Sequence, residues 1–578
     1  MRAICILAVA ACAAQPASTP AASITMAHAP TATPPPAPSA PPPDASYRLR
    51  YVASPAPVLE ISVTTASAEA GLTTFDLGTG FANVTDPEAS VRDVSATDDR
   101  GQPLTLSHPT PHTWRVHGAL GHPVTLRYTV FSTQPPGFDN RFRPIINAHL
   151  VHFVGSLVLM QPTDLADGAC SMRFTWDGLE AAHLQPATSF GSKQTEDVHD
   201  TFDHILESVF VASDAMRRIT RPAGEGTLEL AVTGSWGFTD AELADYIVRV
   251  MTMERAFFAD RGPPYFFVNV FPLDGGTRSY SGTGYTHSFD LALTAGFTLD
   301  AHLRGAIAHE HFHTWNGLLV SPEAFETLTY WVTEGFTNFY TARLRYRAGL
   351  SSLADYTQEI NEDLATYLRS PARGAPNARS TGFWDEPSLG KLPYVRGHVV
   401  ALLADREIRR ATGGKLSLDD VMRVLVKTGR KGATITSERV LAMIEGLTSS
   451  GFAARLRATV IDGAALAIDP ALLEPCLTAT SEKMWTYELG FDWPATRAIR
   501  KIVGVRPGSA AARAGLHDGD SLGGFSLHLG DPTEQVVLTI GPTRRTISYL
   551  PRGQQVAVPQ FAIHDAGACA AVLGPPLP

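Results

Sequence analysis

The spacing of apolar and polar residues divides most of the chain into three stretches. Up to about Trp236, apolar residues alternate with polar ones at a spacing of two, as in Thr125–Phe131 (TLRYTVF). Turn-forming stretches such as DDRGQ and TQPPG separate these runs. A period of two is typical of β-strands with one buried face. The pattern therefore predicts an all-β, sandwich-like domain over residues 46–236.

The spacing becomes helical after residue 236. Thr239 and Glu242 have the Thr-x-x-Glu arrangement of a helix capping box, and apolar residues then recur with helical spacing. Helical patterns dominate from Ala301 to about Ala458, after a strand-like run at Tyr265–Phe271 (YFFVNVF). We therefore expect a mainly helical domain over residues 237–480.

Short strand patterns return near Tyr487. The stretch Lys501–Leu522 (KIVGVRPGSAAARAGLHDGDSL) combines a strand, a turn, a one-turn helix that Ser509 would cap, and a Gly-Asp turn. This string resembles the centre of a bacterial PDZ domain, with Glu488–Phe491 (ELGF) in the place of its carboxylate-binding loop. The resemblance implies a small β-rich PDZ domain over residues 484–565 with a C-terminal peptide as its ligand.

The beginning of the chain has the pattern of an export signal. Met1 and Arg2 supply a positive charge, and the apolar run Ala3–Ala14 has 12 residues, too few for the roughly 20 that span a bilayer. We interpret residues 1–14 as a signal peptide. Val9–Cys12 (VAAC) resembles the lipobox of bacterial lipoproteins, so lipidation of Cys12 and ordinary cleavage are both open. The protein is then expected in the periplasm, on the cell surface, or anchored to a membrane as a lipoprotein.

A linker follows the signal. Ten prolines and no charged residue occur between Ala13 and Pro43. Such a composition cannot bury a core, so residues 15–45 are expected to form an extended linker.

The charge of the chain narrows the classes of binding partner. The chain of 578 residues has 47 basic and 57 acidic residues and a net charge of −10. It has no basic stripe, so we expect no nucleic-acid partner.

Outside the signal, the cysteines are Cys170, Cys476 and Cys569. Export permits disulfides, and Cys476 and Cys569 flank one compact segment, so we predict that they pair and that Cys170 is a buried thiol.

The stretch Ala308–Gly317 (AHEHFHTWNG) places three histidines and one glutamate within five positions. His309 and His313 are four residues apart, so on a helix they share one face and can hold one zinc ion. Glu310 would then lie beside the metal as a general base. The same His-Glu-x-x-His pattern also fits a surface helix with scattered histidines.

The surrounding residues favour the metal site. Apolar side chains on the same stretch would seat the helix in a core: Leu303, Ala306, Ile307 and Phe312. Catalytic zinc keeps three protein ligands, and Glu334 in WVTEGFTNFY offers the third, since a buried glutamate among aromatic residues is costly without a cation. We interpret His311 as structural or supporting, and we expect Trp315 and Asn316 to pack against the site and orient it.

Three segments together resemble the glycyl-aminopeptidase family of gluzincin zinc metallopeptidases. They read HEHFHTWN, WVTEGFTNFY and LPYVRGHVVALLADREIRRATGGKLSLDDVMRVL. The similarity is strongest from about Ala301 to Leu425. It implies a multidomain α+β protein with a β-rich N-terminal domain, a thermolysin-like catalytic domain and a PDZ domain, in the order that the patterns predict.

The resemblance also implies a role for each site residue. One zinc ion would be held by His309, His313 and Glu334, with Glu310 as the general base for zinc-activated water. Tyr394 in PYVRG would donate to the oxyanion of the reaction, and an ordinary buried tyrosine is the alternative. The reaction would be the hydrolysis of peptide bonds in a peptide or protein substrate.

A function of another class is also open. The protein would then be a catalytically idle scaffold that binds peptides through its PDZ and β domains. The presence of every ligand type, the base and the tyrosine favours the peptidase. A zinc content near one equivalent would distinguish the two functions.

The specificity implied by the family name is in doubt. A free N-terminal ammonium needs a carboxylate near the zinc, which the family would place in a Gly-Gly-x-Glu-His string. Here Gly275–Gly276 are followed by Arg278 and Ser279 in the places of the Glu and His, and no glutamate occurs between residues 255 and 309. Asp274, Asp290 or a residue of the N-terminal domain could substitute. We predict that the protein is not a strict glycyl aminopeptidase and can cut peptides whose amino end is acetylated.

Overall fold

The computed structural model describes residues 42–577, apart from residues 68–70, 119–120, 138–139, 167, 275–278, 324–325, 385 and 387. The predicted signal peptide, Cys12 and most of the predicted linker lie outside the described residues. So do Gly275, Gly276 and Arg278 of the string discussed above.

Three sheets form the described part of the N-terminal domain. The largest has the strand order β13-β11-β1-β2-β7-β4. Its strands are β1 (Ala45–Val52), β2 (Val58–Ala66), β4 (Val91–Asp98), β7 (Pro123–Val130), β11 (Ala169–Asp177) and β13 (Thr195–Thr201). The second contains β10 (Gln161–Pro162), β3 (Leu72–Asp76), β6 (Thr113–His117) and β5 (Thr105–Thr110). The third contains β12 (Gln185–Thr188), β14 (Val209–Ser213), β9 (Leu150–Val154) and β8 (Ile145–Ile146), and a short helix α1 (Phe202–Leu206) precedes β14.

These sheets enclose one apolar core. Strand β1 alternates buried and exposed residues, as does β7, so each turns one face inward. Leu49, Phe75, Trp114 and Phe153, from all three sheets, belong to the same buried cluster. The prediction of a β-rich N-terminal domain is confirmed.

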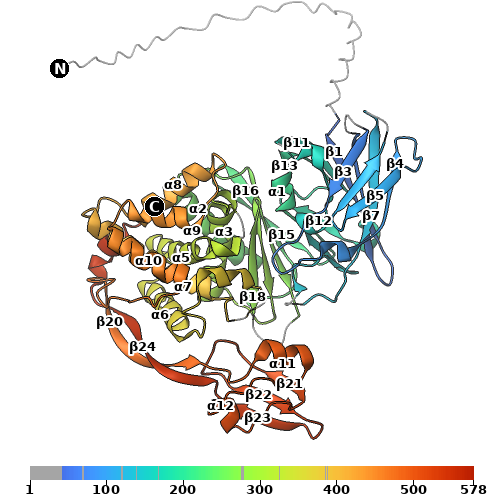
Figure 1. The fold of residues 1–578 in the computed structure, drawn as a ribbon. Helices are drawn as coiled ribbons and strands as arrows, with labels where there is room; N and C mark the ends of the chain where they lie inside the picture. Colours follow the sequence, from blue (N-terminus) through green and yellow to red (C-terminus); the bar gives the residue numbers. More distant parts are fainter. Residues whose placement is uncertain are drawn as a thin grey trace, which may run out of the picture. The chain divides into compact units, whose positions relative to one another are not determined.

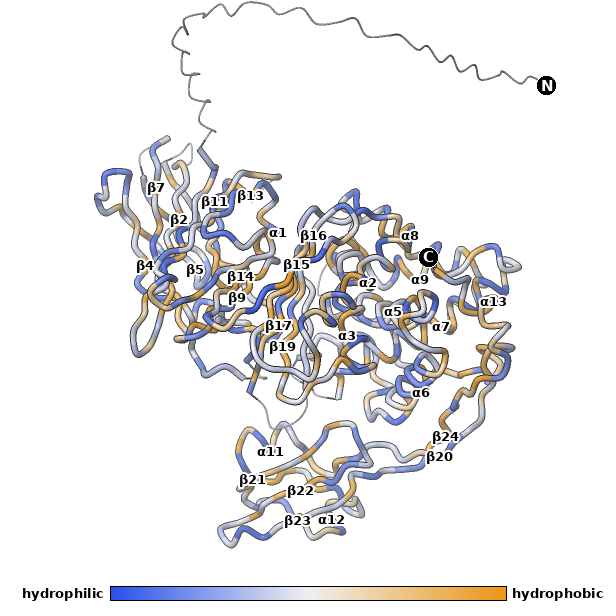
Figure 2. Tube along the Cα trace, turned by 180° about the vertical axis from the view of Figure 1, so that it is seen from behind, coloured by the Kyte–Doolittle hydropathy of each residue, from blue (hydrophilic) through white to orange (hydrophobic). Residues whose placement is uncertain are grey.

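A further sheet supports the helix of the histidine motif. Its described strands have the order β15-β16-β17-β19-β18, with bounds Arg217–Ala223, Gly226–Val232, Tyr265–Pro272, Ser288–Leu293 and Tyr280–Tyr285. Strands β16, β17 and β19 run parallel, while β18 is antiparallel and forms an edge. Parallel strands are buried on both faces, which explains the nearly unbroken apolar runs of β17 and β19 (Figure 2). Strands β15 and β16 thus belong to this sheet, although the sequence pattern assigns them to the domain before residue 236.

Helices cover one face of this sheet and continue to residue 462 (Figure 1). Their bounds are α2 (Asp240–Phe258), α3 (Ala301–Phe312), α4 (Tyr330–Thr333), α5 (Gly335–Arg347), α6 (Leu353–Arg369), α7 (Leu392–Ala411), α8 (Leu418–Gly429), α9 (Ser437–Glu445) and α10 (Ser450–Asp462). The predicted capping box of Thr239 and Glu242 begins α2. None of the described helices has the length and hydropathy that a membrane span requires. The mainly helical second domain is confirmed.

The C-terminal region contains a ribbon and a small separate core. Strands β20 (Leu477–Tyr487) and β24 (Arg552–Ile563) pair antiparallel. Between them lie α11 (Trp493–Ile499), α12 (Ala510–Arg513), β21 (Leu522–Ser526), β22 (Val536–Ile540) and β23 (Arg545–Tyr549). Ser509 caps α12 as the sequence predicts, with its side chain accepting from the Ala512 N–H. These elements confirm a small β-rich segment with its own core, and its identification as a PDZ domain stays a prediction.

The cysteines behave as predicted. Cys476 and Cys569 form a disulfide, and Cys170 is a buried free thiol. Cys569 begins α13 (Cys569–Leu573), and the buried Cys569 and Leu573 pack into the core of the helical domain. The disulfide therefore fastens the end of the chain to the helical domain, across the segment that contains β21–β23.

Two glycines allow α5 and α7 to cross at backbone distance. A Cβ atom on Gly335 would lie 2.3 Å from the Gly397 Cα, and one on Gly397 would lie 2.0 Å from the Trp331 carbonyl oxygen. Neither position can hold a side chain without moving a helix. Glu334 precedes Gly335 directly, and Tyr394 is three residues before Gly397, so this crossing sets the positions of two predicted site residues.

We predict that Gly397→Ala destabilises the protein. The added methyl group has no space at the helix crossing, and overpacking of this kind costs about 1–3 kcal/mol. Thermal or denaturant unfolding measures the loss. The control is Gly451→Ala in α10, where the nearest atom to an added Cβ is the Arg455 Nη1 at 4.0 Å, and where alanine should be neutral or add up to about 1 kcal/mol of stability. Equal stabilities of the two variants would contradict the proposed role of the crossing.

Candidate metal centre and catalytic residues

The two histidines of the motif lie at the end of α3. Asp300 caps the start of this helix through a bond from the Leu303 N–H to its carboxylate, 3.0 Å long. His309 lies in the last turn and His313 is the C-cap, and their ring centroids are 4.7 Å apart. The spacing of four residues thus brings both imidazoles to one side, as the sequence predicts.

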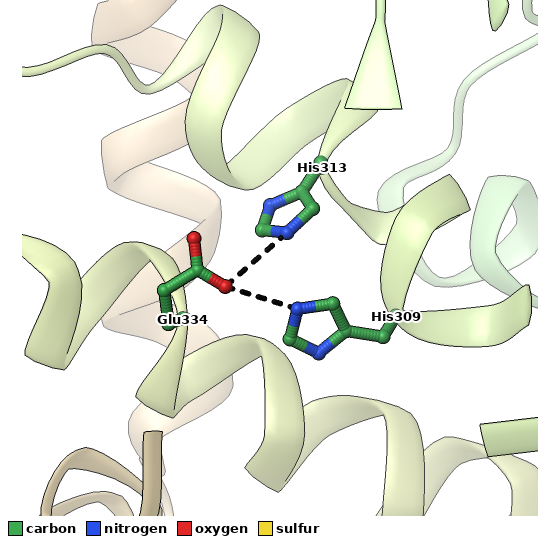
Figure 3. Close-up of side chains that lie close together, drawn as sticks. All are labelled: His309, His313 and Glu334. Carbon is green, nitrogen blue, oxygen red and sulfur yellow. Dashed lines mark hydrogen bonds and ion pairs between the residues drawn. The ribbon is translucent and has the colours of Figure 1, made fainter. Parts of the chain in front are cut away.

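Glu334, at the junction of α4 and α5, completes a cluster with the two histidines. We call His309, His313 and Glu334 the metal group. Its Oε2 is 3.0 Å from the His309 Nε2 and 3.4 Å from the His313 Nε2 (Figure 3). One ligand atom from each of the three residues lies within 4.8 Å of the others. Each side chain is 12–13% exposed. Two imidazole nitrogens and one carboxylate oxygen form a donor set that suits zinc and leaves a position open.

Hydrogen bonds fix the orientation of both imidazoles. The Nδ1 of His309 is 2.8 Å from the side-chain oxygen of Asn338, and the Nδ1 of His313 is 2.9 Å from the backbone oxygen of Asn316. Both partners are acceptors, so the proton of each neutral ring belongs on Nδ1. The Nε2 of a neutral ring then presents a lone pair for a metal, whereas a protonated ring donates from Nε2 to Glu334.

Glu334 and His313 perturb each other's pKa strongly. Burial by itself would raise the pKa of Glu334, but the charge of His313 and hydrogen bonds from both histidines hold it well below the usual range. Burial would lower the pKa of His313, yet the Glu334 carboxylate raises it to about 9. A buried carboxylate here therefore needs positive charge beside it, which protonated histidine or a metal ion supplies.

Glu310 lies on the same side of α3 as the two histidines, against the edge strand β18. A Cβ atom on Gly282 would lie 2.1 Å from the Glu310 Oε1, and one on Gly284 would lie 2.9 Å from the His313 Cβ. The two glycines thus leave room for the side chains of the motif. Burial raises the pKa of the Glu310 carboxyl, and the nearby His309 and His313 act against that rise.

Tyr394 lies beside the same group. Its ring stacks at 5.8 Å from the ring of His309, and its hydroxyl is within hydrogen-bonding reach of Glu334. Burial and the neighbouring Glu334 carboxylate raise the pKa of Tyr394 well above the usual range, so the phenol keeps its proton. All five predicted site residues are therefore brought together: His309, Glu310, His313, Glu334 and Tyr394.

The remaining residues of the motif anchor α3. His311 points away from the metal group and its Nδ1 is 2.7 Å from the Glu254 Oε2 of α2. Burial lowers the pKa of His311 to about 3 and raises that of Glu254, so both groups are uncharged. Trp315 donates its indole N–H to Asp260 and stacks on Phe258.

Asn316 connects the two halves of the metal group. Its side-chain nitrogen donates to the backbone oxygens of Val332 and Thr333 and to the Thr337 hydroxyl, at 2.9–3.2 Å. The segment after α3 is thereby tied to the segment that carries Glu334. We expect Trp315 and Asn316 to orient the site, and these contacts are consistent with that.

Two residues of the site region were missed from the sequence. Asn338 is four residues after Glu334, hence on the same face of α5, and this spacing is a signal that could have found it. Glu254 had no such signal, because it lies 57 residues before His311 in a helix with many other polar residues.

Comparisons with known proteins agree with this arrangement. A family model described as "M61 glycyl aminopeptidase" matches residues 302–391, and a model of the "Peptidase M61 N-terminal domain" matches residues 47–206. The first of these regions contains four of the five site residues. No curated protein matches.

A solved structure shares the fold. A structure from Idiomarina loihiensis, described as an aminopeptidase N family protein, matches with a TM-score of 0.71 and 15% sequence identity. The match covers 92% of this chain and 100% of that one. An M1 zinc metallopeptidase from Deinococcus radiodurans matches 73% of this chain and 94% of its own length, with 15% identity and a TM-score of 0.48.

The N-terminal model matches ahead of the other one, and the match at 302–391 includes His309, His313 and Glu334. We conclude that this chain contains two regions that match domains of the M61 peptidase family.

Proposed function

We propose that this protein is a zinc metallopeptidase that hydrolyses peptide bonds, with Glu310 as its general base and Tyr394 as an oxyanion donor. The observation that carries the proposal is the convergence of His309, His313 and Glu334 on one point, with a fourth, acidic side chain beside it. A single zinc ion held there would supply a Lewis acid for the carbonyl group and the attacking water.

Glu310 supplies the proton transfer in this proposal. Its carboxylate lies on the same side of α3 as the two histidines, so it can accept a proton from the attacking water and deliver it to the leaving amine. Tyr394, whose ring stacks beside that of His309, holds a neutral phenol that can donate to the carbonyl oxygen as negative charge develops.

The edge strand β18 favours an extended peptide as the substrate. This strand ends the described sheet order, so one row of its backbone groups faces away from β19. Exposed strand edges bind extended peptides by adding a strand. Gly282 and Gly284 bring this edge within contact distance of Glu310 and His313, which would place a bound peptide backbone beside the metal.

An idle peptide-binding scaffold remains the alternative function. We expect the purified protein to contain about one equivalent of zinc and a chelator to abolish its activity, and a metal-free protein would favour the scaffold.

We also propose that the chain is exported by residues 1–14, with or without a lipid on Cys12, and that residues 484–565 form a PDZ domain that binds a C-terminal peptide.

We predict that Glu310→Gln keeps the zinc but lowers turnover by about 10²–10⁴-fold, because an amide cannot accept the proton. Zinc content by mass spectrometry and cleavage of a mixed peptide pool test this. Glu362→Gln, on the exposed face of α6, is the control and should behave as wild type. A Glu310→Gln variant with near-wild-type rates would show that the base is another residue.

Tyr394→Phe should lower kcat on the order of 10²-fold and leave KM nearly unchanged, because the lost hydroxyl acts only in the transition state. Steady-state kinetics on one good substrate measure both constants. Tyr346→Phe, whose ring stacks on Tyr356 at 5.8 Å in another part of the helical domain, serves as the control. An unchanged kcat would leave Tyr394 as an ordinary core tyrosine.

We also propose that cleavage does not require a free amino terminus. Asp290, one candidate for binding an ammonium, is buried and bonded to the His152 Nε2 at 2.6 Å and to the Asn269 amide at 3.1 Å. The Arg141 side chain instead brings a positive charge to β18, with its Nε 2.7 Å from the Ser281 hydroxyl. A cation in this position disfavours a substrate ammonium nearby.

We therefore predict that one peptide, prepared with a free and with an acetylated amino terminus, is cut in both forms. Mass spectrometry of the products shows the position of each cut. Release of single residues from the free form, together with complete protection of the acetylated form, would establish an ammonium site and contradict this part of the proposal.

A further inference from the structure

A series of aromatic side chains extends outward from the metal group. Tyr394, next to His309, lies 6.3 Å from the ring of Phe383. Phe383 packs edge-on against Trp384 at 4.9 Å, and Trp384 packs edge-on against Phe142 at 6.1 Å. We call Tyr394, Phe383, Trp384 and Phe142 the aromatic arc. Three different parts of the chain contribute to it: α7, the segment before α7, and the N-terminal domain.

Further contacts connect the outer end of the aromatic arc, Phe142, to α3. The Arg141 guanidinium lies over the Phe142 ring at 4.5 Å, and its Nε bonds the Ser281 hydroxyl of β18 at 2.7 Å. Gly282, the next residue, is in contact with Glu310. The contacts thus link His309 to Glu310 through the aromatic arc, Arg141 and β18.

Trp384 is the exposed member of this path. Its relative exposure is 37%, whereas Phe383 and Phe142 are 8% and 6% exposed. The two buried rings hold it edge-on from both sides, so its position is fixed while much of its surface faces solvent. A tryptophan held in this way offers apolar contact area at little entropic cost, which is why tryptophan is enriched at binding sites.

We propose that Trp384 is a substrate-binding residue that contacts a large apolar, preferably aromatic, side chain on one of the residues that flank the cleaved bond. This inference rests on the proposed peptidase function. It implies a preference for bulky over glycine residues at that position, unlike the specificity in the family's name. Phe383 and Phe142 position Trp384 and need not touch the substrate.

The test uses peptides that are identical except for Gly, Leu or Phe at one of the two positions that flank the cleaved bond, each prepared with a free and with an acetylated amino terminus. Wild type should favour Leu and Phe over Gly at one of these positions. Trp384→Ala should lower kcat/KM for the Phe peptide about tenfold and leave the Gly peptide nearly unchanged, since one aromatic contact of this kind is worth about that factor. Trp384→Phe should retain most of the preference.

A matched control is Trp485→Ala in β20, because Trp485 is 38% exposed and lies outside the aromatic arc. It should keep the wild-type preference. Circular dichroism verifies that all variants are folded. Equal losses on the Gly and Phe peptides for folded Trp384→Ala, or an unchanged preference, would overturn the proposal.

A second readout does not depend on turnover. In the Glu310→Gln background, isothermal titration should show tighter binding of the Phe peptide than of the Gly peptide, and addition of Trp384→Ala should remove the difference. An inactive wild-type protein loaded with zinc would refute the peptidase, whereas binding that discriminates Phe from Gly without regard to Trp384 would refute the role of Trp384 alone.

Discussion

The metal group depends on a constraint of backbone distance. Gly335 and Gly397 let α5 and α7 cross with no side chain between them, and Gly282 and Gly284 leave room between β18 and α3 for the side chains of Glu310 and His313. The first approach brings Glu334 and Tyr394 to the histidines, and the second places a strand edge against Glu310 and His313. A single Cβ at any of these positions would separate elements that the chemistry needs within a few ångströms.

Electrostatic balance is the second condition. Glu334 is mostly buried among aromatic residues, and a carboxylate in such surroundings is stable only beside positive charge. The same demand favours a cation beside His309, His313 and Glu334. The neighbouring His311 and Glu254 are also buried, but burial keeps both of them neutral. Their hydrogen bond fastens α3 to α2 without adding charge near the metal group.

The N-terminal β domain takes part in building the site. Besides Arg141, the side chains of His152 and Ser189 bond to Asp290 and Ser288 of β19. Strand β19 in turn pairs with β18, the strand that borders Glu310. Phe142 adds a ring to the aromatic arc. The domain thus holds β18 and β19 in place and contributes Phe142 to the aromatic arc.

The sequence by itself determined the elements and the chemical donors. Period-two and helical spacing separate the β domain from the helical one, and the four-residue spacing places His309 and His313 on one face. The cost of burying Glu334 among aromatic residues indicates it as the third ligand of the proposed zinc site. These features are local, so a short window of residues contains the whole signal. The spacing and the family resemblance together also named Glu310 and Tyr394.

Strand pairing and side-chain contacts between segments far apart in the sequence were decided only by the tertiary structure. Strands β15 and β16 have strand patterns like those before them, and only pairing with β17 assigns them to the second sheet. Glu254, Arg141 and Trp384 have ordinary polar or aromatic side chains whose partners lie 57 to 242 positions away. No periodicity records such contacts, because they arise from the packing of whole elements, and the surroundings of the metal group were therefore visible only in the folded chain.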